Sequence, residues 1–358
     1  MKTAVFLIAS LLPTSALATE ATSLSRLPVR FGGFVDTYYA YDFQRPPLRD
    51  RAFTTQPARH NEFNVNLAFI EAVVSEDRVR GRLALQAGNS VQSNYGGEPR
   101  VGTVSGSDLT RHIQEAVVGY RVTDKLWIDG GIYLSHIGLE SWISRDNWGY
   151  SRLLMSDFSP YYQAGVKASY QWTESFSSQL HVVNGWQNIS ENNENKALGV
   201  QLAFAPTEGW SVTYNNFYGQ EVGNRGRFFN NVVLKTPAFG RVQGAAAADY
   251  GIQRKLSGGG FSKWYAGALL ARWRLTDRLS ATGRVERYVD EDQVIVTTGG
   301  QGSFRTTAAS INLDMALHPQ LLWRNELRHF WGENPVYPTR SGFAKTDGFL
   351  ASSLGLTF

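Results

Sequence analysis

The chain has 358 residues, no cysteine and a formal net charge of +4, with charged residues of both signs making up 18 %. No cluster of lysine and arginine stands out, which gives no case for a nucleic-acid partner. Aromatic residues make up 13 % and there are 35 glycines, while the mean hydropathy is −0.27. After residue 18, no apolar run approaches the ~18 residues of a membrane helix. This composition therefore predicts a β-rich protein.

The N-terminus has the pattern of a secretory signal peptide. Lys2 precedes an apolar stretch over residues 4–12, and Ala16-Leu17-Ala18 provides an A-x-A-like cleavage site. We expect a signal peptide over residues 1–18, a short periplasmic segment over residues 19–28 and a single domain over residues 29–358. The alternative is a membrane-anchoring helix, for which the apolar stretch is short.

Beyond residue 28, segments of roughly 10–15 residues alternate apolar with polar or small side chains, which is typical of half-buried strands. Short turns and longer polar loops alternate between them. The expected short connections are Glu76-Asp77, Thr123-Asp124, Thr173-Glu174, residues 206–209, Thr236-Pro237, Thr276-Asp277 and His318-Pro319. The expected strands begin near Val29, Asn61, Arg78, Leu109, Lys125, Pro160, Phe176, Lys196, Trp210, Arg225, Phe239, Ser262, Arg278, Ser303, Gln320 and Thr346.

Sixteen antiparallel strands with short periplasmic turns and long extracellular loops predict an all-β transmembrane barrel of the outer membrane. The alternative, a soluble all-β protein, has nothing that forces long and short connections to alternate. About eight strands leave a barrel packed by side chains, whereas 16–18 leave an aqueous channel. Aromatic residues beside the short turns would form a girdle at the membrane interface; they are Tyr170, Trp172, Phe176, Trp210 and Trp273.

Two segments do not alternate cleanly. Counting from Phe63, the lipid-facing set would be Val65, Leu67 and Phe69, and its next member is Glu71. Either a β-bulge shifts the register there or Glu71 lies near the membrane interface. Residues 225–234 also alternate poorly.

The C-terminal residue is Phe358, with Leu354 and Leu356 at alternating positions before it. A terminal phenylalanine on an amphipathic last strand resembles the signal that outer-membrane barrels present to the barrel-assembly machinery.

Several stretches resemble the OmpL-like family of outer-membrane β-barrel porins, in order from about Phe31 to the end. The two most specific are GFVDTYYAYDF over residues 33–43 and RHNEFNVNL over residues 59–67. Further similar stretches lie at residues 131–138, 159–162, 184–187 and 228–231. The resemblance implies an outer-membrane porin of a Gram-negative bacterium, and it brings no agreed substrate or catalytic residue.

If the apolar face points to lipid, the opposite face lines the pore. The pore-lining candidates are Arg80, Arg82, Gln86, Glu115, Arg121, Arg272, Arg274, Arg284, Glu286, Arg324, Glu326 and Arg328. Rows of arginine and glutamate could sort ions, or they could be ion pairs that brace the wall.

The connection over residues 137–159 is long and rich in aromatic and charged residues. We expect it to fold into the barrel and narrow it; the alternative is a cap outside the barrel. Its candidate constriction residues are Trp142, Arg145, Asp146, Arg152 and Asp157.

The first long loop carries four arginines, Arg45, Arg49, Arg51 and Arg59. These could attract anions or pair with lipopolysaccharide phosphates, or they could be an ordinary solvated loop.

No zinc-protease, nucleophile-elbow or phosphate-loop motif is present, and the six histidines form no metal-ligand pattern. We expect no enzyme, cofactor or metal site, but a porin for passive diffusion of small hydrophilic solutes or ions, with a leaning toward anions. The alternatives are a barrel hydrolase, whose site could be assembled across strands, and a structural or adhesion barrel with a closed lumen. A homotrimer in the lipid bilayer is an open alternative for the assembly.

Overall fold

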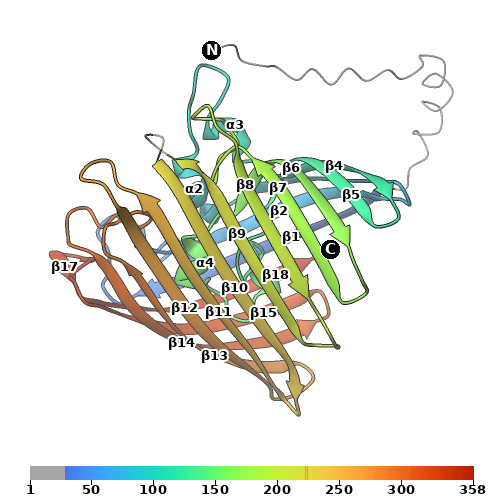
Figure 1. The fold of residues 1–358 in the computed structure, drawn as a ribbon. Helices are drawn as coiled ribbons and strands as arrows, with labels where there is room; N and C mark the ends of the chain where they lie inside the picture. Colours follow the sequence, from blue (N-terminus) through green and yellow to red (C-terminus); the bar gives the residue numbers. More distant parts are fainter. Residues whose placement is uncertain (1–28, 222, 224) are drawn as a thin grey trace.

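The computed structural model describes residues 29–221, 223 and 225–358. The expected signal peptide over residues 1–18 and the periplasmic segment over residues 19–28 lie outside the described residues. In the described part, sixteen antiparallel strands form one closed barrel, in the order β1-β18-β15-β14-β13-β12-β11-β10-β9-β8-β7-β6-β5-β4-β3-β2 (Figure 1). The predicted fold class and strand number are thus confirmed.

Neighbouring strands of the barrel follow one another in the chain, apart from the closure of β1 on β18. The strands are β1 (Val29–Asp42), β2 (Phe63–Ser75), β3 (Val79–Ala87), β4 (Ile113–Thr123), β5 (Leu126–Leu134), β6 (Tyr162–Gln171), β7 (Phe176–Val183), β8 (Ala197–Phe204), β9 (Ser211–Glu221), β10 (Arg225–Phe239), β11 (Val242–Arg254), β12 (Phe261–Arg274), β13 (Leu279–Asp290), β14 (Phe304–His318), β15 (Leu321–Gly332) and β18 (Thr346–Thr357). The barrel closes where Gly33 N–H donates to Phe358 O (2.9 Å) and Phe358 N–H donates to Gly33 O (3.1 Å).

Short helices and one hairpin lie in the long loops. They are α2 (Asn89–Asn94), η2 (Tyr95–Gly97) and α3 (Ser107–Thr110) between β3 and β4; η3 (Ser144–Asp146) and α4 (Leu154–Asp157) between β5 and β6; and the hairpin of β16 (Tyr337–Thr339) with β17 (Gly342–Ala344) before β18. Among the residues described, no helix has the length and apolar character needed to cross a membrane.

Two predicted boundaries are wrong. The strand expected near Leu109 begins at Ile113, because Ser107–Thr110 forms the helix α3. Thr236-Pro237 is not a turn but lies inside β10, and the chain reverses at Gly240 and Arg241 instead. The β10–β11 register shifts between Lys235 and Ala238. Proline has no N–H to donate to a neighbouring strand. It is therefore tolerated at an irregularity, where the regular hydrogen bonding is interrupted.

The irregular alternation in β2 is a register shift. The pairing register with β1 shifts between Asp36 and Thr37: Asp36 is the register partner of Leu67, and Thr37 is that of Val65. The expectation that Leu67 and Phe69 face lipid is therefore wrong: both are buried, whereas Ile70 is 61 % exposed. A bulge inserts one extra residue and so exchanges the two faces beyond it.

Residues 225–234 alternate regularly in the structure. Arg227, Phe229 and Asn231 are buried, and Phe228 and Val232 between them are exposed. The residue types alternate poorly because the inward set mixes a cation, an aromatic ring and an amide.

Candidate functional site

The connection over residues 135–161, called here the inner loop, lies inside the barrel. Ser144 Oγ donates to Asp36 Oδ2 on β1 (2.7 Å), and Tyr150 N–H donates to Asn312 Oδ1 on β14 (3.2 Å). Both acceptors are fully buried inward-facing residues. In Figure 1, α4 of this loop is seen within the ring of strands. The loop thus occupies the interior rather than capping the barrel from outside.

One side of the interior binds the inner loop through ion pairs. Arg284 on β13 contacts Glu326 on β15 (2.7 Å), and Arg328 pairs with Glu286. Arg284 also donates to the carbonyl of Ser151 (2.6 Å), and Arg328 donates to that of Arg152 (2.6 Å). These charges are at most 5 % exposed. Each of these two arginines therefore binds both a carboxylate of the wall and the backbone of the inner loop.

A third arginine acts in the same way closer to the periplasmic end. Arg324 forms a two-point ion pair with Asp314 (2.8 and 3.0 Å) and donates to the carbonyls of Ser144 and Asn147. A guanidinium has five donors in a fixed fork, so one side chain can satisfy a carboxylate and two loop carbonyls together. Arg284, Arg324 and Arg328 therefore hold the inner loop by its backbone.

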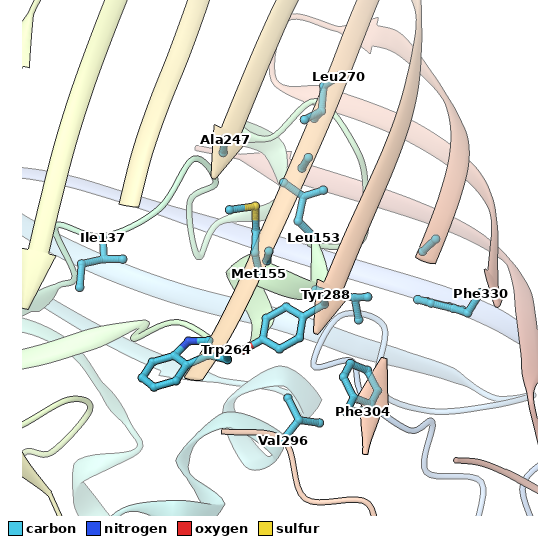
Figure 2. Packing of buried hydrophobic residues seen from close by; sticks show 14 of the residues in the cluster. Ile137, Leu153, Met155, Ala247, Trp264, Leu270, Tyr288, Val296, Phe304 and Phe330 are labelled. Carbon is cyan, nitrogen blue, oxygen red and sulfur yellow. The ribbon is translucent and has the colours of Figure 1, made fainter. Parts of the chain in front are cut away.

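The strands β11 and β12, next to β13 in the barrel, bind the inner loop through apolar packing. Leu153, Leu154 and Met155 belong to one buried cluster with Ala247 on β11 and Leu270 on β12. In Figure 2, Leu153 and Met155 lie among the side chains that these strands contribute. Small inward residues on β11 and β12 leave the space that the loop fills. The loop is thus anchored by charge on β13 and β15 and by packing on the neighbouring strands β11 and β12, where Leu270 is paired with Arg284 across the sheet.

Other long loops pack above the inner loop. The carboxylate of Asp290 accepts the N–H groups of Val294, Ile295 and Val296 at 2.8–2.9 Å, which folds residues 291–303 back over the barrel. From the first loop, Phe53 contacts Phe304 (4.7 Å between centroids). The extracellular half of the interior is thus filled by loop side chains.

The periplasmic half holds two cavities. The first, of about 490 Å³, is lined by residues from β1 to β7 and is called the lysine cavity after Lys167. Its charged lining residues are Arg30, Arg80, Arg82, Lys125, Lys167 and Asp129. The second, of about 340 Å³, lies between β10 and β15 and is called the arginine cavity. Its charged lining residues are Arg241, Arg272, Arg274, Arg278, Asp277 and Asp314.

The predicted pore-lining residues are divided among these places. Arg80 and Arg82 line the lysine cavity, and Arg272 and Arg274 line the arginine cavity. Arg121 pairs with Asp77 (2.5 Å) at the periplasmic turns. Two others are buried: Glu115 pairs with Arg82, and Gln86 Oε1 accepts the indole N–H of Trp142. The remaining five, which hold the inner loop, are Arg284, Glu286, Arg324, Glu326 and Arg328.

The constriction candidates are not gathered at one point. Asp157 accepts from Thr55 Oγ1 (2.8 Å) and from Tyr161, and burial raises the pKa of its carboxyl. Arg152 lies over the ring of Tyr161 (3.8 Å). Trp142 is bound at Gln86, as described above. Arg145 and Asp146 pair with each other at the loop surface (3.4 Å).

Several interior residues were not singled out from the sequence. Lys167 lies on the polar face of β6, but only the structure places it at a cavity, 4.8 Å over the ring of Tyr133. For Asp36 and Asp290, the sequence shows only that each lies on the polar face of its strand. Within the described ranges, no group of three or more His, Asp or Glu residues could hold a metal ion.

The outer face of the barrel exposes large apolar side chains, among them Leu269, Ile311 and Leu327. A closed sixteen-stranded antiparallel barrel with such a face and an internal loop defines an outer-membrane channel protein. The family model "Putative beta-barrel porin-2, OmpL-like" matches residues 28–358, and the chain belongs to this family. It is an outer-membrane porin, and its family places it in a Gram-negative outer membrane. No curated protein matches the chain.

Solved porin structures share the fold at low sequence identity. The outer membrane channel DcaP of Acinetobacter baumannii aligns with a TM-score of 0.61 at 11 % identity, over 93 % of this chain and 98 % of that one. An anion-selective porin from Comamonas acidovorans gives 0.57 at 11 %, over 92 % and 99 %. The trimer form of OmpT from Vibrio cholerae gives 0.59 at 10 %, over 92 % and 99 %. At this identity the likeness establishes the fold.

Proposed function

We propose that this porin passes small hydrophilic solutes by passive diffusion with a preference for anions. The observation that carries the proposal is the charge of the lysine cavity, which five basic side chains and only one acidic side chain line. That acid, Asp129, is already bound by Arg80 (2.5 and 2.6 Å). Field lines from one sign of charge concentrate in a cleft with low-dielectric walls and raise the local anion concentration there.

Lys167 is a cavity residue that is available to a passing anion. Its side chain is partly buried at the cavity wall, and within the described ranges no carboxylate lies within ion-pair distance of it. The guanidinium of Arg82, by contrast, is shared between Glu71 and Glu115. The lysine ammonium therefore keeps unsatisfied donors toward the cavity.

The test is a reversal-potential measurement in planar bilayers under a KCl gradient. We expect an anion-selective potential that falls in Lys167→Gln and is retained in Lys196→Gln, which removes the same charge at an exposed pair with Glu191. A cation-selective wild-type channel, or an equal response of the two variants, contradicts the proposal.

We also propose that the inner loop is the constriction of the channel. Its support is the loop's position inside the barrel, where ion pairs with β13 and β15 and apolar contacts with β11 and β12 hold it. Replacing residues 141–156 by a short glycine linker should raise the single-channel current several-fold. An unchanged current in a folded variant removes the constriction role.

We further propose that the chain is a channel without enzymatic activity and that it assembles as a homotrimer. The inward histidines support the first point, since His136 contacts Gln163 and Asn216 and His181 contacts Tyr133 and Gln179, with no serine among these partners. The trimer form described for the structurally similar OmpT supports the second. Ester-hydrolysis assays and mass measurement in detergent test them.

We also propose that the first loop contacts lipopolysaccharide. Arg51 is buried against Asp42 (3.2 Å), and Arg59 is paired with Asp50 and Glu62. Of the four arginines of this loop, Arg45 and Arg49 therefore remain for phosphates, and loss of lipopolysaccharide binding in their double glutamine variant is the test.

A further inference from the structure

The arginine cavity collects four guanidinium groups from separate parts of the chain. Arg241 comes from the turn before β11, Arg272 and Arg274 from the end of β12, and Arg278 from the turn before β13. They share a space of about 340 Å³ at the periplasmic mouth. Four like charges in so small a space repel one another, and a bound counter-ion relieves that repulsion.

The acids beside the cavity do not neutralise these arginines. Both carboxylate oxygens of Asp314 are bound by Arg324 (2.8 and 3.0 Å). Among the described residues, none of the four arginines lies in an ion pair: Arg272 donates to Ser280 Oγ (3.1 Å), and Arg241 donates to the carbonyl of Leu275 (3.1 Å). Only Asp277, in the turn itself, is left to compensate four positive charges.

The cavity opens toward the lumen rather than toward lipid. Arg272 and Arg274 alternate with Trp273, which is 53 % exposed on the outer face. Arg272 is paired across the sheet with Thr282, which is buried inside the barrel. A solute that travels through the channel therefore reaches these guanidinium groups.

We propose that the arginine cavity binds a phosphate-type oxyanion at the periplasmic mouth. A guanidinium presents parallel N–H donors that match two oxygens of one phosphate. Guanidinium groups from different strands can then bind different oxygens of the same tetrahedral anion. A chloride ion has no separate oxygens and cannot be bound in this way. The inference rests on the proposed anion-conducting function and names the solute class that the channel favours.

Titration calorimetry of the detergent-solubilised protein with inorganic phosphate tests the site directly. We expect saturable binding to the wild type and a loss of at least tenfold in affinity in Arg274→Gln/Arg278→Gln. The matched control, Arg254→Gln/Lys263→Gln, removes two positive charges outside the cavity and should bind phosphate as the wild type does. Heat-modified mobility on gels verifies that each variant contains a folded barrel.

A second measurement separates this inference from the proposed function. In bilayers conducting chloride, micromolar to millimolar phosphate should reduce the wild-type current, and the double arginine variant should resist this block. Calorimetric binding without any conductance overturns the channel proposal but not the site. Conductance without phosphate binding, equal binding by both double variants, or binding of solubilised phosphatidylglycerol but not of inorganic phosphate overturns the site.

Discussion

The backbone N–H of Ser151 donates to Glu326 Oε2 across 2.6 Å, and the hydroxyl of the same serine donates to Oε1 of that carboxylate at 3.0 Å. The two residues are 175 positions apart in the chain. Arg284 binds both of them, reaching Glu326 Oε1 at 2.7 Å and the Ser151 carbonyl at 2.6 Å. The tip of the inner loop is therefore fixed to the wall by a buried carboxylate and a buried guanidinium.

Removing Glu326 should loosen the inner loop and destabilise the barrel. In Glu326→Ala, the buried Arg284 loses its principal counter-charge and the Ser151 donors lose their acceptor. Breaking a buried ion pair from one side costs roughly 3–5 kcal/mol. Urea unfolding in detergent, followed by tryptophan fluorescence, should show the loss, and single-channel current should rise. Glu333→Ala, which removes an exposed partner of Arg287, should unfold as the wild type does; similar losses in both variants contradict the anchor role.

Asp290 should control the loop over residues 291–303. Its carboxylate accepts three consecutive backbone N–H groups, and each charge-assisted bond contributes about 1.5–3 kcal/mol. Asp290→Ala should expose this loop to limited proteolysis while the barrel stays intact. Asp292→Ala removes a half-exposed acid of the same loop, paired with Lys255 at 3.5 Å, and should be cleaved as slowly as the wild type. Equal cleavage of the two variants would refute this role.

The buried carboxyl of Asp157 should make the stability of the docked inner loop depend on pH. Burial raises the pKa of this carboxyl above its ordinary value near 4. The folded loop thus prefers the protonated form, and the group's contribution to stability declines as pH rises from about 4 through the raised pKa. Asp157→Asn should therefore melt at the same temperature as the wild type near pH 4 and at a higher temperature at pH 8. Asp146→Asn, at the loop surface, provides the control, and a difference that shrinks with rising pH would show the sign to be wrong.

Gly33 should be required for closure of the barrel. A Cβ at this position would lie 2.5 Å from the ring of Phe358 and 2.8 Å from the carbonyl oxygen of Phe69. Gly33→Val should therefore lower the thermal stability of the folded barrel, read as the temperature at which its heat-modified gel mobility is lost. Gly283→Val is the comparison, because a Cβ there meets no atom within 4 Å. If the two variants melt alike, Phe358 does not need the space that Gly33 leaves.

Phe358 is also the proposed signal for the barrel-assembly machinery. Deleting it should reduce the amount of folded protein in cells severalfold, because the last strand then loses its terminal aromatic side chain. The same variant refolded from urea into detergent distinguishes the roles. Normal refolding with poor assembly in cells supports a signal, whereas failure in both settings points to closure of the barrel alone.

The sequence determined the architecture because the evidence for a barrel is local. Parity along a strand has a period of two residues, and a hairpin turn needs only a few turn-forming residues. Fourteen of the sixteen predicted strand starts therefore lie within two residues of the observed ones. The failures at Leu109 and Pro237 arise where a loop helix or a bulge changes the pattern.

Parity also determined which residues face inward, but not what they contact there. Arg80 and Arg284 were both predicted from the sequence to line the pore. In the structure Arg80 lines a cavity, whereas Arg284 binds the inner loop. That choice depends on where a loop 133 positions from Arg284 enters the barrel. The alternation of side chains along a strand shows only which of them face lipid and which face the interior. Ion pairs and cavities depend on contacts across the barrel, and these form only when the sheet closes.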